Sequence, residues 1–331
     1  MGSNGPMRQI LILGGTGWLG REIATQLVAR GEAVTCLARG ESGDVPVGAT
    51  LIRADRTVAG AYDLVASQYW DDVIELTYDS GLVRGALKAL HDRAAHWTLV
   101  SSVSVYASNS EPQADETAAV VDAGELENYY GLAKVAAEQA SFTAVGDRLL
   151  IARPGLIAGP GDPSDRFGYW IARLALAQGE PILVPDCGQL PVQVIDVRDI
   201  ASWIIQAGHE SLTGTFNVVG DQHTLADTIG KAAALAGYSG TIVEAPEKWL
   251  VEHDVDHWMG ARSLPLWVSG SDAAHGQRSN LAFRHAHGRT RSISKTLADT
   301  LEDEKRRGLG RERKSGLTRL EELDLIAELS R

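Results

Sequence analysis

Short apolar runs and longer segments with helical spacing alternate along the first half of the chain. An apolar run that is too short for a helix and is bounded by glycine predicts a buried strand, and apolar residues three or four apart predict a helix. Repeated strand–helix alternation favours a parallel, doubly wound α/β sheet. We expect strands over residues 9–13, 33–37, 51–54, 72–77, 97–101 and 148–152, and helices over 20–30, 81–93 and 130–145.

The pattern loosens after Gly159, where a Gly/Pro-rich turn begins. We expect a helix over 167–178, then a strand over 192–195, a helix over 199–207 and a strand over 215–219 that return to the sheet. Later helical segments are interrupted by prolines and by a Gly/Ser/His-rich stretch. We therefore expect a dinucleotide-binding domain over 7–160 with a return segment over 192–220, and a smaller substrate-binding lobe from 161–191 and 221–331.

The last segment of the chain combines a charge run with an apolar stripe. Residues 302–313 carry charges of both signs, and leucine and isoleucine side chains then recur at helical spacing. This pattern predicts a solvated linker and a C-terminal helix, with a partner-binding tail as the alternative. The stripe consists of Leu317, Leu320, Leu323, Ile326 and Leu329.

Composition excludes several classes of protein. Lys and Arg number 31 against 43 Asp and Glu, a net charge of −12, which should repel a nucleic-acid backbone. The two cysteines, Cys36 and Cys187, rule out a disulfide framework in 331 residues. No apolar run reaches the ~18 residues of a membrane helix, and residues 1–6 lack the basic and apolar regions of a signal peptide. We expect a cytoplasmic protein that binds neither nucleic acid nor membrane.

A glycine-rich loop follows the first predicted strand. Residues 14–20 read G-G-T-G-W-L-G and lead directly into a helix, the context of a dinucleotide-binding fingerprint in a Rossmann fold. Glycine lets the backbone approach a pyrophosphate, whose charge the helix N-terminus favours. The predicted cofactor-binding residues of this loop are Gly14, Thr16, Gly17, Trp18, Leu19 and Gly20.

The end of the second predicted strand indicates which dinucleotide binds. An acidic residue there would accept a hydrogen bond from the ribose 2′-OH of NAD. This chain has Arg39, a cation that can pair with a 2′-phosphate, so we expect NADP(H), with NAD as the alternative. Asp55 follows the third strand and is a candidate neighbour of the adenine. Thr77 and Pro154, at the ends of two further strands, complete the predicted cofactor site.

A tyrosine and a lysine lie four residues apart on one face of a predicted helix. These are Tyr130 and Lys134, and Ser102 stands at the end of a strand that precedes them. A phenol of pKa ~10 needs a nearby cation to work as an acid or base at neutral pH. We therefore predict that Tyr130 exchanges a proton with a carbonyl or alcohol oxygen, that Lys134 supports it, and that Ser102 orients the same oxygen.

These motifs together resemble the extended short-chain dehydrogenase/reductase superfamily, including its NAD-dependent epimerase/dehydratase branch. Residues 101–106, S-S-V-S-V-Y, look like the family's S-S-x-x-V-Y segment, in which Ser102 matches the catalytic Ser/Thr. Residues 194–201 and 214–218 are similar to two later family blocks. The resemblance covers roughly residues 8–300 and implies a Rossmann sheet with a small C-terminal substrate lobe, often in a homodimer.

One departure from the family pattern bears on the substrate. Sugar-nucleotide members typically read R-x-x-N-x-x-G-P, whereas residues 153–160 read R-P-G-L-I-A-G-P, so Leu156 replaces the asparagine. An apolar side chain cannot donate to a diphosphate, and the segment looks more like that of ketoreductase relatives. We expect Val103, Ser104 and Leu156 to line the substrate site.

Other candidate residues are weaker. Trp249, Trp258 and Trp267 belong either to the core or to the wall of an apolar pocket. His253 and His257 stand four apart on a possible helix, but no third ligand follows from the spacing, and we expect no metal.

The leading hypothesis is an NADP(H)-dependent oxidoreductase that acts on a carbonyl or secondary alcohol of a small, non-nucleotide substrate. A sugar-nucleotide epimerase or dehydratase that keeps its NAD bound is the first alternative. A non-catalytic dinucleotide-binding protein, or an RNA-associated relative of the fold, is the second.

Overall fold

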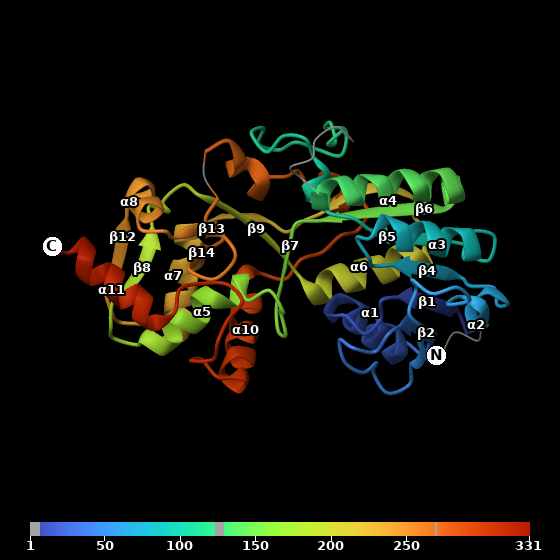
Figure 1. The fold of residues 1–331 in the computed structure, drawn as a ribbon, viewed down its shortest axis with the longest axis horizontal. Helices are drawn as coiled ribbons and strands as arrows, with labels where there is room; N and C mark the ends of the chain where they lie inside the picture. The colour runs from blue at the N-terminus through green and yellow to red at the C-terminus, as the bar shows by residue number, and fades with distance from the viewer. Residues whose placement is uncertain (1–6, 123–128, 269) are drawn as a thin grey trace.

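A seven-stranded parallel sheet forms the centre of the larger part of the molecule (Figure 1). The computed structural model describes residues 7–122, 129–268 and 270–331. The strand order is β10-β6-β5-β4-β1-β2-β3, which confirms the predicted doubly wound sheet and reverses direction between β1 and β4. The strands are β1 (Gln9–Leu13), β2 (Ala33–Ala38), β3 (Thr50–Arg53), β4 (Asp72–Glu75), β5 (Trp97–Val100), β6 (Leu149–Pro154) and β10 (Gly214–Val218).

Helices cover both faces of this sheet, which explains why its strands are apolar on both sides. Side chains alternate across a strand, so Ile10 and Ile12 pack on the face of α1 and α6, while Leu11 and Leu13 pack on the face of α3. The helices around the sheet are α1 (Trp18–Ala29), α2 (Asp63–Ala66), α3 (Ser80–Leu90), α4 (Tyr129–Val145), α6 (Val197–His209) and α9 (Leu281–His285).

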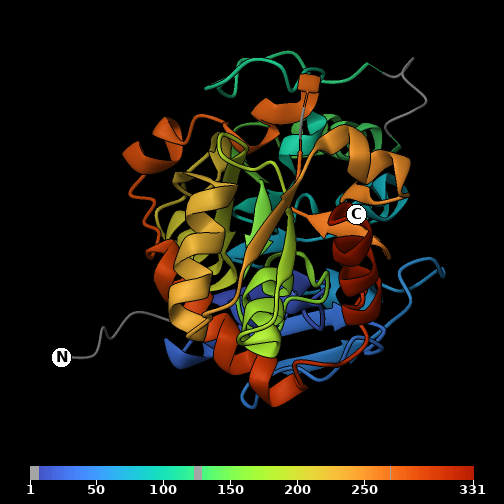
Figure 2. The ribbon, with the colours of Figure 1, turned by 90° about the vertical axis from the view of Figure 1, so that its left-hand side faces the viewer.

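A smaller part lies at the left of Figure 1, and in Figure 2 its helices stand in front of the sheet. It contains three small sheets, with orders β11-β9-β7, β12-β8 and β13-β14, around a separate apolar core. No helix in the described ranges is long and apolar enough to cross a membrane. The elements of this part are β7 (Leu156–Ala158), α5 (Arg166–Ala177), β8 (Ile182–Pro185), β9 (Pro191–Asp196), β11 (Gln222–Thr224), α7 (Leu225–Ala236), β12 (Ile242–Ala245), α8 (Glu247–Glu252), β13 (Asp256–Trp258), β14 (Ser263–Pro265), α10 (Ile293–Arg307) and α11 (Arg319–Leu329).

The expectation that a strand over 192–195 returns to the main sheet is wrong. This segment is β9, which pairs with β7 and β11 in the smaller part. Of the two predicted return strands, β10 alone joins the seven-stranded sheet, beside β6. The apolar pattern is the same for a strand in either sheet, so it cannot distinguish them.

The predicted solvated charge run is also wrong in part. Glu304 of α10 is buried and pairs with Arg307, Arg311 and Arg313, and the last two of these bring the following loop back onto the helix. Asp165, at the start of α5, also pairs with Arg311. Part of this charge run therefore joins two helices, while Glu302, Lys305 and Arg306 face water as predicted.

The C-terminal apolar stripe is only partly a buried face. Leu317 and Ile326 are buried, but Leu320 is 70% exposed. Glu322 is buried in its place and pairs with Arg173 and Arg319.

Candidate functional site

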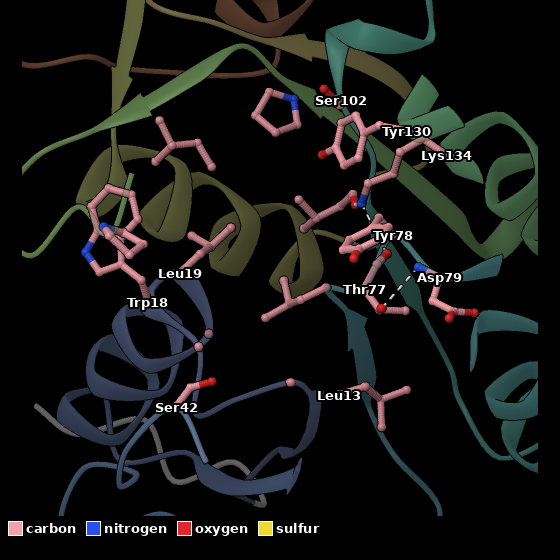
Figure 3. A pocket seen from close by; sticks show the side chains of 18 of the residues that line it. Leu13, Trp18, Leu19, Ser42, Thr77, Tyr78, Asp79, Ser102, Tyr130 and Lys134 are labelled. Carbon is pink, nitrogen blue, oxygen red and sulfur yellow. Dashed lines mark hydrogen bonds between the residues drawn. The ribbon is translucent and has the colours of Figure 1, made fainter. Parts of the chain in front are cut away.

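A cavity of about 1210 Å³ lies at the carboxyl edge of the seven-stranded sheet, where the strand order reverses between β1 and β4. In open α/β sheets this position is where ligands bind. Segments from both parts of the molecule line the cavity, and Figure 3 shows part of its wall. All the residues predicted for the cofactor, the catalytic group and the substrate wall lie in this lining: Gly14, Thr16, Gly17, Trp18, Leu19, Gly20, Arg39, Asp55, Thr77, Ser102, Val103, Ser104, Tyr130, Lys134, Pro154 and Leu156.

The glycine loop forms the cavity wall at the start of α1. Gly14 has φ +99°, and a Cβ on Gly20 would lie 2.5 Å from the carbonyl oxygen of Gly14, so neither position accepts a side chain without strain. Gly17 caps α1 without a side-chain hydrogen bond. Gly15 packs against Cys36 of β2 and does not line the cavity. Gly14, Gly17 and Gly20, spaced three residues apart, therefore face the cavity, and Gly15 does not.

Arg39 lies at the outer rim of the cavity and already has an acidic partner. Its Nη2 atom is 3.0 Å from Oε2 of Glu41, and both side chains are exposed. Asp55 stands nearby; hydrogen bonds from the hydroxyl and backbone N–H of Thr57 and the charge of Arg39 lower its pKa. Two carboxylates therefore accompany Arg39 at the place where a 2′-phosphate was predicted, and Arg21 and Arg53 approach the loop that follows it.

Tyr130 and Ser102 meet inside the cavity, as Figure 3 shows. Burial raises the pKa of Tyr130, and a hydrogen bond with Ser102 opposes that rise. The ring of Tyr78 packs at a tilt against the Tyr130 ring, with centroids 5.6 Å apart. Ser102 also begins a short 3-10 helix (Val103–Val105), where its hydroxyl accepts from the N–H of Ser104 at 3.1 Å.

Lys134 is buried one turn further along α4. Its Nζ donates to the carbonyl oxygens of Val100 at 2.5 Å and of Thr77 at 3.1 Å. Burial lowers the pKa of Lys134 to about 8, against the opposing charges of Glu75 and Glu138. The strand ends of β4 and β5 thus fix this ammonium group in place.

Arg166, a cation that lines the cavity, was not predicted from the sequence. Arg166, the first residue of α5, lines the wall, and its charge lowers the pKa of Tyr130. Positive charge that acts on the Tyr130 phenol therefore comes from α5, in the smaller part of the molecule. Nothing in the sequence around Arg166 except the preceding turn, P-S-D, marked it, because its position depends on how α5 packs.

Behind the cavity wall, a buried polar network joins α4 to β5 and β6. Glu138 accepts from the Ser101 hydroxyl at 2.5 Å and from Arg153 at 2.9 and 2.6 Å. Arg153 also donates to the Tyr106 hydroxyl at 3.1 Å. This network fixes α4, which carries Tyr130 and Lys134, relative to the strand that ends at Ser102.

The tryptophans of the smaller part divide between the two alternatives. Trp267 is fully buried in the core, whereas Trp258 lines the cavity beside Met259 and His275. Trp249 stacks on His253, with ring centroids 3.8 Å apart, and packs against the core.

The histidine pair at 253 and 257 does not share a helix. Helix α8 ends at Glu252, and His257 belongs to β13. Their nearest ionic partners differ: Glu328 for His253 and Glu247 for His257. Within the described ranges, no group of three or more His, Cys, Asp or Glu side chains has an arrangement that could hold a metal ion.

Comparisons with known proteins identify the family and the fold. The sequence model of the NAD dependent epimerase/dehydratase family matches residues 10–219. A curated relative, the chloroplast stem-loop binding protein of 41 kDa b from Arabidopsis thaliana, is 27% identical over 258 residues, 70% of this chain. The match covers 63% of that relative, so the chain spans less than two thirds of its length.

Two solved structures show the same fold. UDP-glucuronic acid 4-epimerase from Bacillus cereus, in complex with NAD, has 16% identity and a TM-score of 0.67, with 90% of this chain and 99% of that chain covered. UDP-glucose 4-epimerase from Thermus thermophilus, in complex with NAD, has 18% identity, a TM-score of 0.65 and the same coverage. At such low identities the likeness establishes the architecture only.

Proposed function

The chain belongs to the NAD-dependent epimerase/dehydratase family, and from that premise we propose that it is an enzyme that uses a nicotinamide dinucleotide to act on a secondary alcohol or carbonyl of a small molecule. The observation that carries the proposal is the meeting of three side chains, Ser102, Tyr130 and Lys134, in the same cavity as the glycine loop. A glycine loop alone would only bind a dinucleotide. The phenol of Tyr130 and the ammonium of Lys134 add groups that can carry out acid–base chemistry.

The residues of the cavity fit such a cofactor. Gly14, Gly17 and Gly20 present bare backbone and the N-terminus of α1, where the helix dipole favours a pyrophosphate. When bound, the nicotinamide supplies reversible hydride acceptance. An ammonium has three protons, and Lys134 commits two to the carbonyls of Thr77 and Val100, so one remains for a ribose hydroxyl of the cofactor.

Tyr130 and Ser102 would act on the substrate oxygen. The phenolate of Tyr130 would take the proton of the alcohol and become the phenol, which in the reverse direction would return the proton to the carbonyl oxygen. The hydroxyl of Ser102 would donate a hydrogen bond to the same oxygen. Because burial raises the pKa of Tyr130, its phenol is mainly protonated in the unloaded protein, and the charge of Arg166 opposes this. Lys134, which is held by the ends of β4 and β5, would hold the ribose of the cofactor beside Tyr130.

We favour the cycle in which the cofactor stays bound, as in an epimerase or dehydratase, over a reductase that exchanges NADP(H). The family match supports this choice, as do structural neighbours that are UDP-sugar epimerases with NAD. The rim of the cavity supports it too, since Glu41 pairs with Arg39 and Asp55 adds a second negative charge, which disfavours a 2′-phosphate. The proposed cofactor is therefore NAD, in place of the NADP(H) expected from Arg39 alone.

The reductase remains the second candidate because of Leu156. This side chain is buried in the cavity wall and offers no donor to a nucleotide diphosphate. A non-nucleotide substrate suits such a wall better.

The decisive experiment identifies the nucleotide that the purified protein carries. Denaturation followed by mass analysis should release NAD, and in titrations the protein should bind NAD(H) more tightly than NADPH. Tyr130→Phe should leave this binding nearly unchanged and abolish turnover of a UDP-sugar panel. Preference for NADPH, with NADPH-dependent reduction of carbonyl compounds, would favour the reductase. A protein that binds neither nucleotide would overturn the enzyme proposal.

The name of the curated relative refers to stem-loop binding, which suggests a nucleic-acid ligand for that protein. We propose no such role for this chain, because a net charge of −12 opposes binding to a phosphate backbone. A gel-shift assay with a stem-loop RNA at physiological salt should show no complex.

A homodimer, in contrast, is part of the proposal and can be tested by light scattering.

A further inference from the structure

The cavity wall at the start of α5 contains an arginine that lies over an aromatic ring. The guanidinium of Arg166 lies over the ring of Trp258, 5.1 Å from its centroid, and Nε donates to the hydroxyl of Ser164 at 3.2 Å. The neighbouring lining residue His275 meets the Trp258 ring edge-on, at 5.3 Å between centroids. Three distant segments of the sequence therefore converge on one small region of the wall.

Arg166 differs from the other partly buried arginines in its ionic partners. Arg56, Arg153, Arg173 and Arg198 each pair with a buried carboxylate, whereas in the described part of the chain Arg166 has no carboxylate within ion-pair distance. It shares this with the buried Arg278, but Arg278 does not line the cavity and donates to the carbonyl of Ser108 and to Asn109, whereas Arg166 lies in the cavity wall. The acidic side chain that acts on it electrostatically, Asp162, instead accepts hydrogen bonds from the N–H and hydroxyl of Ser164, at 2.8 and 3.0 Å.

Such a guanidinium is poised for an external anion. Burial lowers the pKa of Arg166, so the charge is partly desolvated and an incoming oxyanion gains more than it would in water. Planar guanidinium groups bind carboxylates and phosphates through two parallel hydrogen bonds. Burial also lowers the pKa of His275 to about 4, so this imidazole is neutral and can donate or accept a hydrogen bond without competing for the anion.

The backbone on both sides of this region is strained. Trp258 has φ +66° and Asp165, directly before Arg166, has φ +60°, in the left-handed region that bulky residues rarely adopt. Strain of this kind lowers stability, more for Trp258 than for Asp165 because aspartate tolerates this region, and it concentrates at ligand sites. The fold therefore maintains the positions of Trp258 and Arg166 at a cost in stability.

We propose that Arg166, Trp258 and His275 form a subsite for an anionic group, a carboxylate or a phosphate, of the substrate. The inference rests on the proposed function and deepens it, since it assigns the substrate a negative charge close to the carbon on which Tyr130 acts. Arg166 binds the anion with its outer nitrogens, and the Trp258 ring supports the guanidinium from behind. Neutral or uncharged analogues of the substrate should bind poorly.

The test uses the full chain saturated with NAD, so that the glycine loop is filled, and titrates inorganic phosphate and malonate by calorimetry. Arg166→Gln should weaken binding of the preferred anion at least tenfold, and Arg166→Lys should recover only part of it because lysine lacks the planar fork. Lys248→Gln, which removes an exposed cation elsewhere, should change nothing. The probe that binds more tightly identifies the oxyanion.

NAD affinity and the unfolding midpoint of each variant separate this inference from the proposed function. Arg166→Gln should keep both unchanged, so a lost anion with retained NAD supports the subsite. Equal anion affinity in wild type and Arg166→Gln, or no anion binding to the wild type, overturns it. If the protein does not bind NAD, the same titrations on the unloaded chain still decide the subsite, whereas the proposed function fails.

Discussion

One part of the cavity wall, the cofactor end, is built around the backbone of the glycine loop, and another, the substrate end, is built from charged and aromatic side chains of the smaller part. The glycine loop, the end of β2 and the start of α1 build the cofactor end from about 25 neighbouring residues, as a single βαβ unit does. The substrate end takes Arg166, Trp258 and His275 from three segments of the smaller part. Local sequence specifies the turn and the helix start of the first arrangement, whereas the second exists only after the smaller part has packed against the sheet.

Lys134 lines the same cavity, and its titration gives the largest expected effect on the free energy of unfolding. Its pKa is about 8 in the folded protein against 10.5 ordinarily, so between these pH values the unfolded chain binds more protons. The free energy of unfolding of the wild type should therefore rise with pH across this window, by ~3 kcal/mol relative to Lys134→Met.

Urea unfolding of both proteins at pH 7.5 and near pH 10.5 measures this difference, since other titrating groups cancel between them. Parallel pH profiles for the two proteins would mean that Lys134 is not buried as described. The comparison of the two ends would then lose its shared cation.

Two glycine substitutions test whether the cofactor end is truly a backbone surface. A Cβ on Gly20 would lie 2.5 Å from a carbonyl oxygen and 2.8 Å from Leu76, so Gly20→Ala should cost about 1–3 kcal/mol and weaken NAD binding at least tenfold. Gly230 of α7 has open space around its Cβ position, so Gly230→Ala should stabilise by about 0.5–1 kcal/mol. Unfolding and NAD titrations check both, and a Gly20→Ala protein with normal NAD affinity would contradict the cradle.

Matched tryptophans compare the cores of the two parts. Trp170, in the smaller part, donates its indole N–H to the carbonyl of Pro265 at 2.8 Å. Trp97 is the first residue of β5, and its buried indole N–H has no acceptor in the described part of the chain. Replacement by phenylalanine removes the same atoms at both positions. Trp170→Phe should cost about 1 kcal/mol more than Trp97→Phe, because it leaves a buried carbonyl unpaired.

Chemical denaturation of the two variants gives this difference directly. If Trp97→Phe proves the more costly, the two cores are packed differently from the description above. The apolar clusters around the two residues would then need to be redefined.

The smallest effect concerns His96, beneath the sheet and far from the cavity. Burial opposes its protonation, but the hydrogen bond to Asp72 at 3.0 Å and the charge of Asp72 raise its pKa above 6.5. The folded state therefore binds more protons, and this stabilisation should be full below pH 6.5 and be lost as pH rises through the raised pKa. His96→Gln should lack that decline in thermal unfolding scans, and a decline that persists would assign it to another group.

Much of the fold followed from residue patterns. The alternation of apolar segments predicted the strands from β1 to β6, because strands buried on both faces need continuous apolar runs. It did not place β9, whose apolar pattern suits either sheet, and it missed β7, β11, β13 and β14, which have three residues each, too few for a period to show. It also missed β8 and β12, which are as long as β3 to β5 but lie where the strand–helix alternation no longer repeats. The buried Glu304 cluster looked like a solvated charge run, since sequence shows charges but not their partners.

The sequence by itself determined the glycine cradle, the Tyr130–Lys134 spacing on one helix and the doubly wound sheet, because each depends on contacts within a few residues or within one repeating unit. Only the tertiary structure decided that Trp258 faces the cavity while Trp267 is buried, and that Arg166 stands near Tyr130 without a carboxylate partner in the described ranges. These features depend on distances between segments far apart in the chain. Such distances are set by the packing of whole elements, which no local pattern encodes.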